Sequence, residues 1–158
     1  MTVEICLVNL GNTGEFKYYE VDTLEALNEA YEDMRAVFNA DDIEIQGMSH
    51  SDRVVNYLGD LLEMTEENGA DLEDALNILD ATGCIEATRE AIENGSYSYY
   101  MADDKESAFI EYLEDICYFE GIPERVINYL DYKKIMQDFE IEGLQIEWLD
   151  YNKYLFIY

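Results

Sequence analysis

Few residues of this chain could supply the chemistry of a catalytic or metal site. Its 158 residues include one histidine, one proline, one tryptophan and three cysteines. The single histidine, His50, is expected in an exposed loop and leaves little from which to build a catalytic triad or a histidine-based metal site. The cysteines lie far apart and form no Cys-x-x-Cys pair, which predicts buried, reduced thiols. We therefore expect no catalytic residue, metal or cofactor.

Long apolar runs are missing too. No stretch approaches the roughly 18 uninterrupted apolar residues that indicate a membrane span. The start, Met1 to Glu4, has neither the basic nor the apolar region of a signal peptide. With 49% hydrophobic residues the chain should nevertheless fold rather than stay disordered. These features predict a folded protein of the cytoplasm.

Basic side chains are scarce relative to acidic ones. Nine lysines and arginines face 37 aspartates and glutamates, so the formal net charge is −28. Duplex DNA carries one negative charge per ~1.7 Å of axis, so this charge matches roughly 14 base pairs. A compact chain of this length has a diameter of roughly 40 Å, close to the length of that duplex. Because self-repulsion destabilises a compact fold, such a charge calls for a functional explanation.

The acidic residues are arranged as well as abundant. No lysine or arginine occurs between Val54 and Thr88. Carboxylates recur at i,i+4, as in Glu63 and Glu67, where like charges on a helix cost a few tenths of a kcal/mol and lie ~5–6 Å apart. The predicted acidic surface comprises Glu25, Glu29, Asp33, Asp60, Glu63, Glu66, Glu67, Asp71, Glu73, Asp74, Asp80, Glu86, Glu90, Glu93, Asp103, Asp104, Glu111, Glu114 and Asp115.

The acidity is also compatible with two simpler roles. A solvated acidic face can serve solubility alone, as in halophile proteins. Acidic clusters also bind Ca²⁺ or Mg²⁺ weakly, although Asp71 to Asp74 lacks the alternating ligands of an EF-hand.

Hydrophobic periodicity predicts an α+β protein with a three-unit organisation. Residues 1–50 are expected to form a small α+β unit and residues 51–95 an acidic helical unit. Residues 96–158 are expected to form a C-terminal α+β unit that ends in a hairpin. Its last strand, Tyr154 to Tyr158, is apolar on both faces, which predicts a subunit interface.

One segment carries a family resemblance. The run from Gly121 to Asp138 resembles the Gly…Ile-Pro-Glu…Asn-Tyr-Ile-Asp-Tyr…Asp stretch of the ArdA antirestriction family, and the opening strand with Val8-Asn9-Leu10-Gly11 is similar to that family's start. The order of the three predicted units also resembles it. The matching positions, which form the predicted dimer region, are Gly121, Ile122, Pro123, Asn128, Tyr129, Asp131, Tyr132 and Asp138.

The resemblance implies a DNA mimic encoded by a plasmid, transposon or phage. Such a protein would inhibit type I restriction–modification enzymes by occupying their DNA-binding groove, stoichiometrically and without catalysis. It would be an elongated, curved homodimer joined through the C-terminal unit, and it would bind neither nucleic acid nor membrane. The charge fits an alternative equally well, namely an acidic inhibitor of another DNA-binding protein such as a CRISPR effector or a repressor.

Overall fold

The computed structural model describes residues 1–48 and 50–158, and for residues 52 and 53 it describes the backbone alone. The fold is α+β, as the sequence predicts. The chain divides into two compact units, here called the first unit (residues 1–93) and the second unit (residues 94–158).

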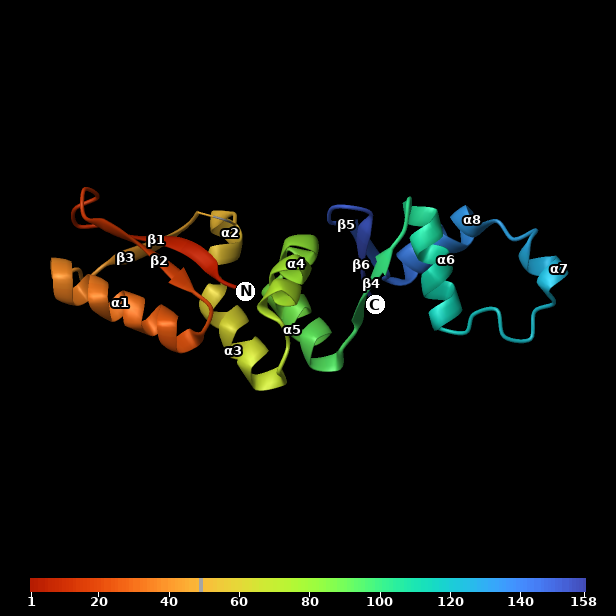
Figure 1. Cartoon of the computed structure of the whole chain (residues 1–158), viewed down its shortest axis with the longest axis horizontal. Coiled ribbons are helices and arrows are strands. Elements are labelled where there is room, and N and C mark those ends of the chain that lie inside the picture. Colours follow the sequence, from red (N-terminus) through yellow and green to blue (C-terminus); the bar gives the residue numbers. More distant parts are fainter. Residues whose placement is uncertain (49) are drawn as a thin grey trace. The chain divides into compact units, whose positions relative to one another are not determined.

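The first unit is built on a three-stranded antiparallel sheet. Its strands are β1 (Val3–Asn9), β2 (Phe16–Val21) and β3 (Ile43–Gly47), in the order β2-β1-β3. Side chains alternate between the two faces of a strand, and Val3, Ile5 and Leu7 of the central strand are fully buried. Helix α1 (Leu24–Phe38) packs on that face of the sheet (Figure 1).

Helix α1 begins one residue later than the capping pattern predicts. The sequence favours Asp22 as its first cap, yet Thr23 is the N-cap and its hydroxyl accepts a hydrogen bond from the Ala26 amide at 3.1 Å. Leu27, Ala30 and Met34 form the buried stripe of the helix. The stripe leaves the acidic face of α1 toward solvent, as its periodicity predicts.

Four helices follow the sheet: α2 (Asp52–Val55), α3 (Leu58–Asn68), α4 (Leu72–Thr82) and α5 (Ile85–Asn94). The sequence predicts one helix over the first two of these, but the structure has a break between Val55 and Leu58. Gly69 and Gly83 stand in the left-handed region, with φ of 66° and 64°, and end α3 and α4.

These helices share the first unit with the sheet. Helix α2 packs against β3, and α1 packs against α3. The boundary predicted after residue 50 therefore falls inside one compact unit. The second boundary, predicted after residue 95, lies after residue 93.

The second unit combines the sheet β4-β6-β5 with helices. Its strands are β4 (Tyr97–Met101), β5 (Gln145–Trp148) and β6 (Lys153–Ile157), and its helices are α6 (Lys105–Asp115), α7 (Glu124–Ile127) and α8 (Tyr132–Glu142). Phe109, Tyr112 and Phe156 lie in its aromatic core. Helical periodicity predicts Ile116 in that core, but α6 ends at Asp115 and the Ile116 side chain is 44% exposed.

The apolar last strand has a local explanation. Strand β6 is the central strand of its sheet, and the neighbouring residues Leu155 and Phe156, which point to opposite faces, are both fully buried in the single chain. Its apolar faces therefore do not by themselves indicate a subunit interface.

The cysteines differ in exposure. Cys6 is buried, but Cys84 and Cys117 are exposed, so the prediction of three buried thiols is wrong for two of them.

Within the described residues, no helix combines the length and apolar character needed to cross a membrane.

Candidate functional site

The carboxylates of the predicted acidic surface lie at the surface of both units. Asp33 and Asp74 are half-buried, and the other members are exposed. Those up to Glu93 belong to the first unit, mainly on α1, α3, α4 and α5, and those from Asp103 to Asp115 belong to the second. The structure brings the clearest group together along the seam between α1 and α3.

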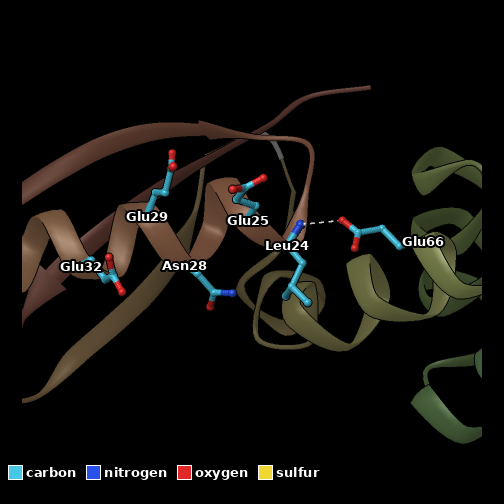
Figure 2. A pocket seen from close by; sticks show the side chains of 6 residues that line it. All are labelled: Leu24, Glu25, Asn28, Glu29, Glu32 and Glu66. Carbon is cyan, nitrogen blue, oxygen red and sulfur yellow. Dashed lines mark hydrogen bonds between the residues drawn. The ribbon is translucent and has the colours of Figure 1, made fainter.

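Four glutamates line one hollow at this seam. Glu25, Glu29 and Glu32 come from α1 and Glu66 comes from α3, around a volume of about 500 Å³ (Figure 2). Leu24 and Asn28 complete the lining. Glu32 is not in the predicted acidic surface, although helical spacing predicts it on the acidic face of this helix with Glu25 and Glu29.

Glu66 also fixes the start of α1. Its Oε1 accepts a hydrogen bond from the Leu24 amide at 3.0 Å, drawn as the dashed line in Figure 2. Leu24 opens the helix, where free N–H groups and the helix dipole favour a negative charge. The contact joins residues 42 positions apart, a separation at which helical periodicity gives no signal.

A second acidic hollow adjoins the first. Asp60 and Glu63 of α3 line a volume of about 490 Å³ together with Tyr31 of α1. Leu24 and Asn28 line both hollows. The acidic lining therefore continues along the α1–α3 seam, and we call it the seam surface: Glu25, Glu29, Glu32, Asp60, Glu63 and Glu66.

Several other predicted carboxylates hold local structure. Asp71 caps α4 by accepting from the Glu73 amide at 2.9 Å, and Asp104 caps α6 by accepting from the Ser107 amide at 2.8 Å. Hydrogen bonds from Ser107 lower the pKa of Asp104. The fold itself therefore requires part of the acidity.

Three more members of the predicted surface accept hydrogen bonds from side chains. Glu86 accepts from the Cys84 thiol at 3.2 Å, which lowers the pKa of Glu86. Asp103 accepts from the Asn152 amide at 3.3 Å. Asp115 accepts from the Tyr100 hydroxyl, and burial together with this hydrogen bond raises the pKa of Tyr100 to about 12.

Asp33 is the member whose charge is most clearly engaged. Its Oδ2 lies 2.6 Å from the Lys17 ammonium and accepts a hydrogen bond from the Tyr19 hydroxyl at 2.6 Å. The hydrogen bond from Lys17, then that from Tyr19, lowers the pKa of Asp33 below its ordinary value of 3.8. Asp33 thus joins α1 to β2 and offers less charge to a partner than its neighbours do.

Replacing the partners of Asp33 should raise its pKa in a set order. We expect a larger rise for Lys17→Met than for Tyr19→Phe, because Lys17 is the stronger influence. Since the folded-state pKa lies below the unfolded one, the contribution of Asp33 to stability is present above about pH 4 and is lost as the pH falls through the folded value. Carboxyl ¹³C NMR titration measures both variants, and a larger rise in Tyr19→Phe would contradict this ranking.

The motif residues of the second unit split into two groups, and the first shapes the backbone. Pro123 is the N-cap of α7, and Asp131 caps α8 by accepting from the Lys134 amide at 3.2 Å. The Tyr132 hydroxyl donates to the Ile127 carbonyl at 3.1 Å. Gly121 has a φ of 80°, which favours glycine.

The second group faces solvent. Asn128 and Asp138 are exposed and Ile122 is half-buried. Tyr129 is 88% exposed, and neither α7 nor α8 contains a buried residue. This part of the motif is available for contact with another molecule.

His50 lies at a small hollow of the first unit. Its side chain is half-buried, not exposed as predicted, and it lines a volume of about 270 Å³ with Leu76 and Asp80. Among the residues that the structure describes, no three His, Cys, Asp or Glu side chains are grouped so that they could hold a metal ion.

The comparisons with known proteins add no family or fold assignment. No protein-family model, no curated protein and no solved structure matches this chain.

Proposed function

We propose that this chain is an acidic DNA mimic that inhibits type I restriction–modification enzymes by stoichiometric occupation of their DNA-binding groove. It would act in the cytoplasm of a bacterial host, on behalf of a mobile element or phage, without catalysis or cofactor. The observation that carries the proposal is the seam surface, where carboxylates from two helices gather in a chain of net charge −28.

The placement of these carboxylates favours mimicry over solubility. Solubility requires negative charge at the surface but gives no reason for glutamates of two helices to face one hollow, where they repel one another. A groove lined with lysine and arginine would turn that repulsion into attraction. Helical geometry places the Cβ atoms of residues three or four apart at ~5–6 Å, so the carboxylates of α1 form a closely spaced row of negative charge, as the phosphates of a DNA strand do.

The mechanism predicts that the protein inhibits more than one kind of enzyme. Phosphate contacts position a protein on DNA without reading its sequence. A protein that offers carboxylates in place of phosphates should therefore inhibit enzymes with different recognition sites. DNA should compete with it for the same groove.

We propose a homodimer joined through the second unit. Support comes from large apolar side chains left exposed on or beside α7 and α8, with Val126, Tyr129 and Ile141 exposed by 42%, 88% and 83%. Two copies would double the charge of 28 per chain and match roughly 28 base pairs by the spacing of duplex charges.

Binding and inhibition should depend strongly on salt. Titrating a purified type I restriction complex should give stoichiometric loss of cleavage, with affinity falling at least about 100-fold between roughly 50 and 200 mM salt, as for a partner that contacts several phosphates. A Cas effector and a repressor, assayed in parallel, test the alternative target classes. Inhibition that is unchanged across this salt range, or that is catalytic in the protein, would contradict the proposal.

A further inference from the structure

The face of the first sheet that α1 leaves open has a composition unlike the rest of the surface. Strand alternation and the observed register place every second residue on this face. Met48 follows the end of β3 and its amide donates to the Glu4 carbonyl at 3.1 Å. We call this the open sheet face, and its three cross-strand rows are Phe16–Val8–Glu44, Tyr18–Cys6–Gln46 and Glu20–Glu4–Met48.

Two aromatic rings stand on the open sheet face. Phe16 is 48% exposed and Tyr18 is 59% exposed. Their rings meet edge to face with centroids 5.6 Å apart, an arrangement that aromatic pairs favour. Phe16 therefore supports the Tyr18 ring while leaving much of it open to solvent.

A hollow lies beside Tyr18. It has a volume of about 400 Å³, and its lining includes Glu4, Tyr18, Glu20 and Met48. One wall is thus aromatic, one is a flexible thioether and two are carboxylates. This combination suits a ligand that is flat, cationic and attached to an apolar stem.

The charges on this face favour a cation. Glu4 lies directly opposite Glu20 in the register of β1 and β2, and both carboxylates belong to residues that line the hollow. None of the nine residues of the open sheet face is basic. The nearby Lys17 belongs to the other face, where it pairs with Asp33 at 2.6 Å.

We propose that this hollow receives an arginine side chain from a basic protein partner. The guanidinium would stack on the Tyr18 ring and donate hydrogen bonds to the carboxylates of Glu4 and Glu20, while its methylene stem contacts Met48. Arginine suits the site better than lysine because its planar group stacks and offers several donors in a fixed fork. The inference rests on the proposed function for the source of the arginine, the DNA-binding target.

Such a contact differs in kind from phosphate mimicry. DNA offers the target no aromatic side chain held beside a pair of carboxylates. Stacking and apolar burial depend less on ionic strength than exposed charge pairs do. The hollow would therefore bind one defined side chain of the target, whereas the seam surface supplies only diffuse attraction.

The first experiment uses the isolated protein and a defined probe. N-acetyl-arginine amide is titrated into labelled protein at constant ionic strength and followed by NMR. We expect saturable shifts of the Tyr18 ring and of the Glu4 and Glu20 amides, with binding at least threefold tighter than for N-acetyl-lysine amide. Tyr151, which is 87% exposed and lies outside the proposed dimer region, provides an internal control ring. An equal shift at that ring, or equal binding of the lysine probe, would overturn the inference.

Two variants test the aromatic wall. Tyr18→Ala should abolish the saturable shifts, whereas Tyr18→Phe keeps the ring and should retain them. Because Tyr18 is 59% exposed, neither variant should unfold, and the amide spectrum verifies this. Wild-type binding by a folded Tyr18→Ala protein would overturn the proposed stacking.

A second experiment separates this inference from the proposed function. Tyr18→Ala should weaken binding to the restriction complex about fivefold with an unchanged slope against salt concentration. If the arginine probe binds but the complex does not bind the protein at all, the arginine site stands and the proposed function fails. If the complex binds wild type and Tyr18→Ala equally, the proposed function stands and the hollow has no part in it.

Discussion

Replacing Glu29, Glu67 and Glu90 together with lysine should weaken binding to the target by roughly 30- to 150-fold. Each replacement removes an attraction and adds a repulsion, and we assign to each the value of a helical surface ion pair, about 0.3–0.5 kcal/mol. Six such changes sum to about 2–3 kcal/mol, which gives that range. The three side chains are exposed on α1, α3 and α5.

The same variant should be more stable than the wild type. Each lysine would follow a glutamate four residues earlier, namely Glu25, Glu63 and Glu86. A repulsive pair then becomes an attractive one in the favoured orientation, with glutamate nearer the helix N-terminus. The free energy of unfolding should rise by about 1–2 kcal/mol in total, as chemical denaturation would measure.

A charge-matched control separates position from total charge. Replacing Glu120, Glu142 and Glu147 with lysine also changes the net charge from −28 to −22, because each replacement changes the charge by +2. These residues are exposed and lie outside the predicted acidic surface. If the control loses as much affinity as the test variant, total charge governs binding and the positions we assign are wrong.

Gly47→Ala should destabilise the first unit by about 1–3 kcal/mol, the usual cost of forcing atoms into a packed site. A Cβ built at Gly47 would overlap the backbone carbonyl oxygen of His50 and crowd the backbone of Ser51. Backbone atoms cannot turn aside as a flexible side chain can. The end of β3 and the start of α2 would have to separate, and thermal or denaturant unfolding would detect the loss.

Gly59→Ala is the matched control for this change. Gly59 lies in α3, and a methyl group added there would meet Leu27 Cδ2 at 3.8 Å, an ordinary contact. Alanine restricts the unfolded chain more than glycine does, so this variant should gain about 0.4–1 kcal/mol. Equal effects of the two substitutions would show that the close approach at Gly47 does not matter.

Local signals in the sequence are sufficient to predict most elements. The sequence predicts a strand over Tyr97–Met101, which are the bounds of β4, and it predicts that Gly69 and Gly83 end helices, as they do. Such features depend on a few neighbouring residues. The break between α2 and α3 escapes prediction because Val54, Val55 and Leu58 keep a helical apolar spacing across it and are all buried.

Only part of the arrangement of the acidic side chains can be predicted from the sequence. Helical spacing predicts which carboxylates of α1 share a face, because residues four apart lie on one side of a helix. It cannot predict that Glu66 reaches the Leu24 amide or that Lys17 and Tyr19 engage Asp33. Those contacts depend on tertiary packing between separate elements, and they decide which charges remain available.

The net charge also protects the protein from self-association, because both sheets have edge strands. Strands β2 and β3 are the edge strands of one sheet and β4 and β5 are those of the other, and the backbone of an edge strand can pair with another chain. Mutual repulsion of many like charges keeps the edge strands of two molecules apart at neutral pH. Near the isoelectric point of about 4.1 that protection vanishes, so acidification exposes the protein to self-association through its own sheets.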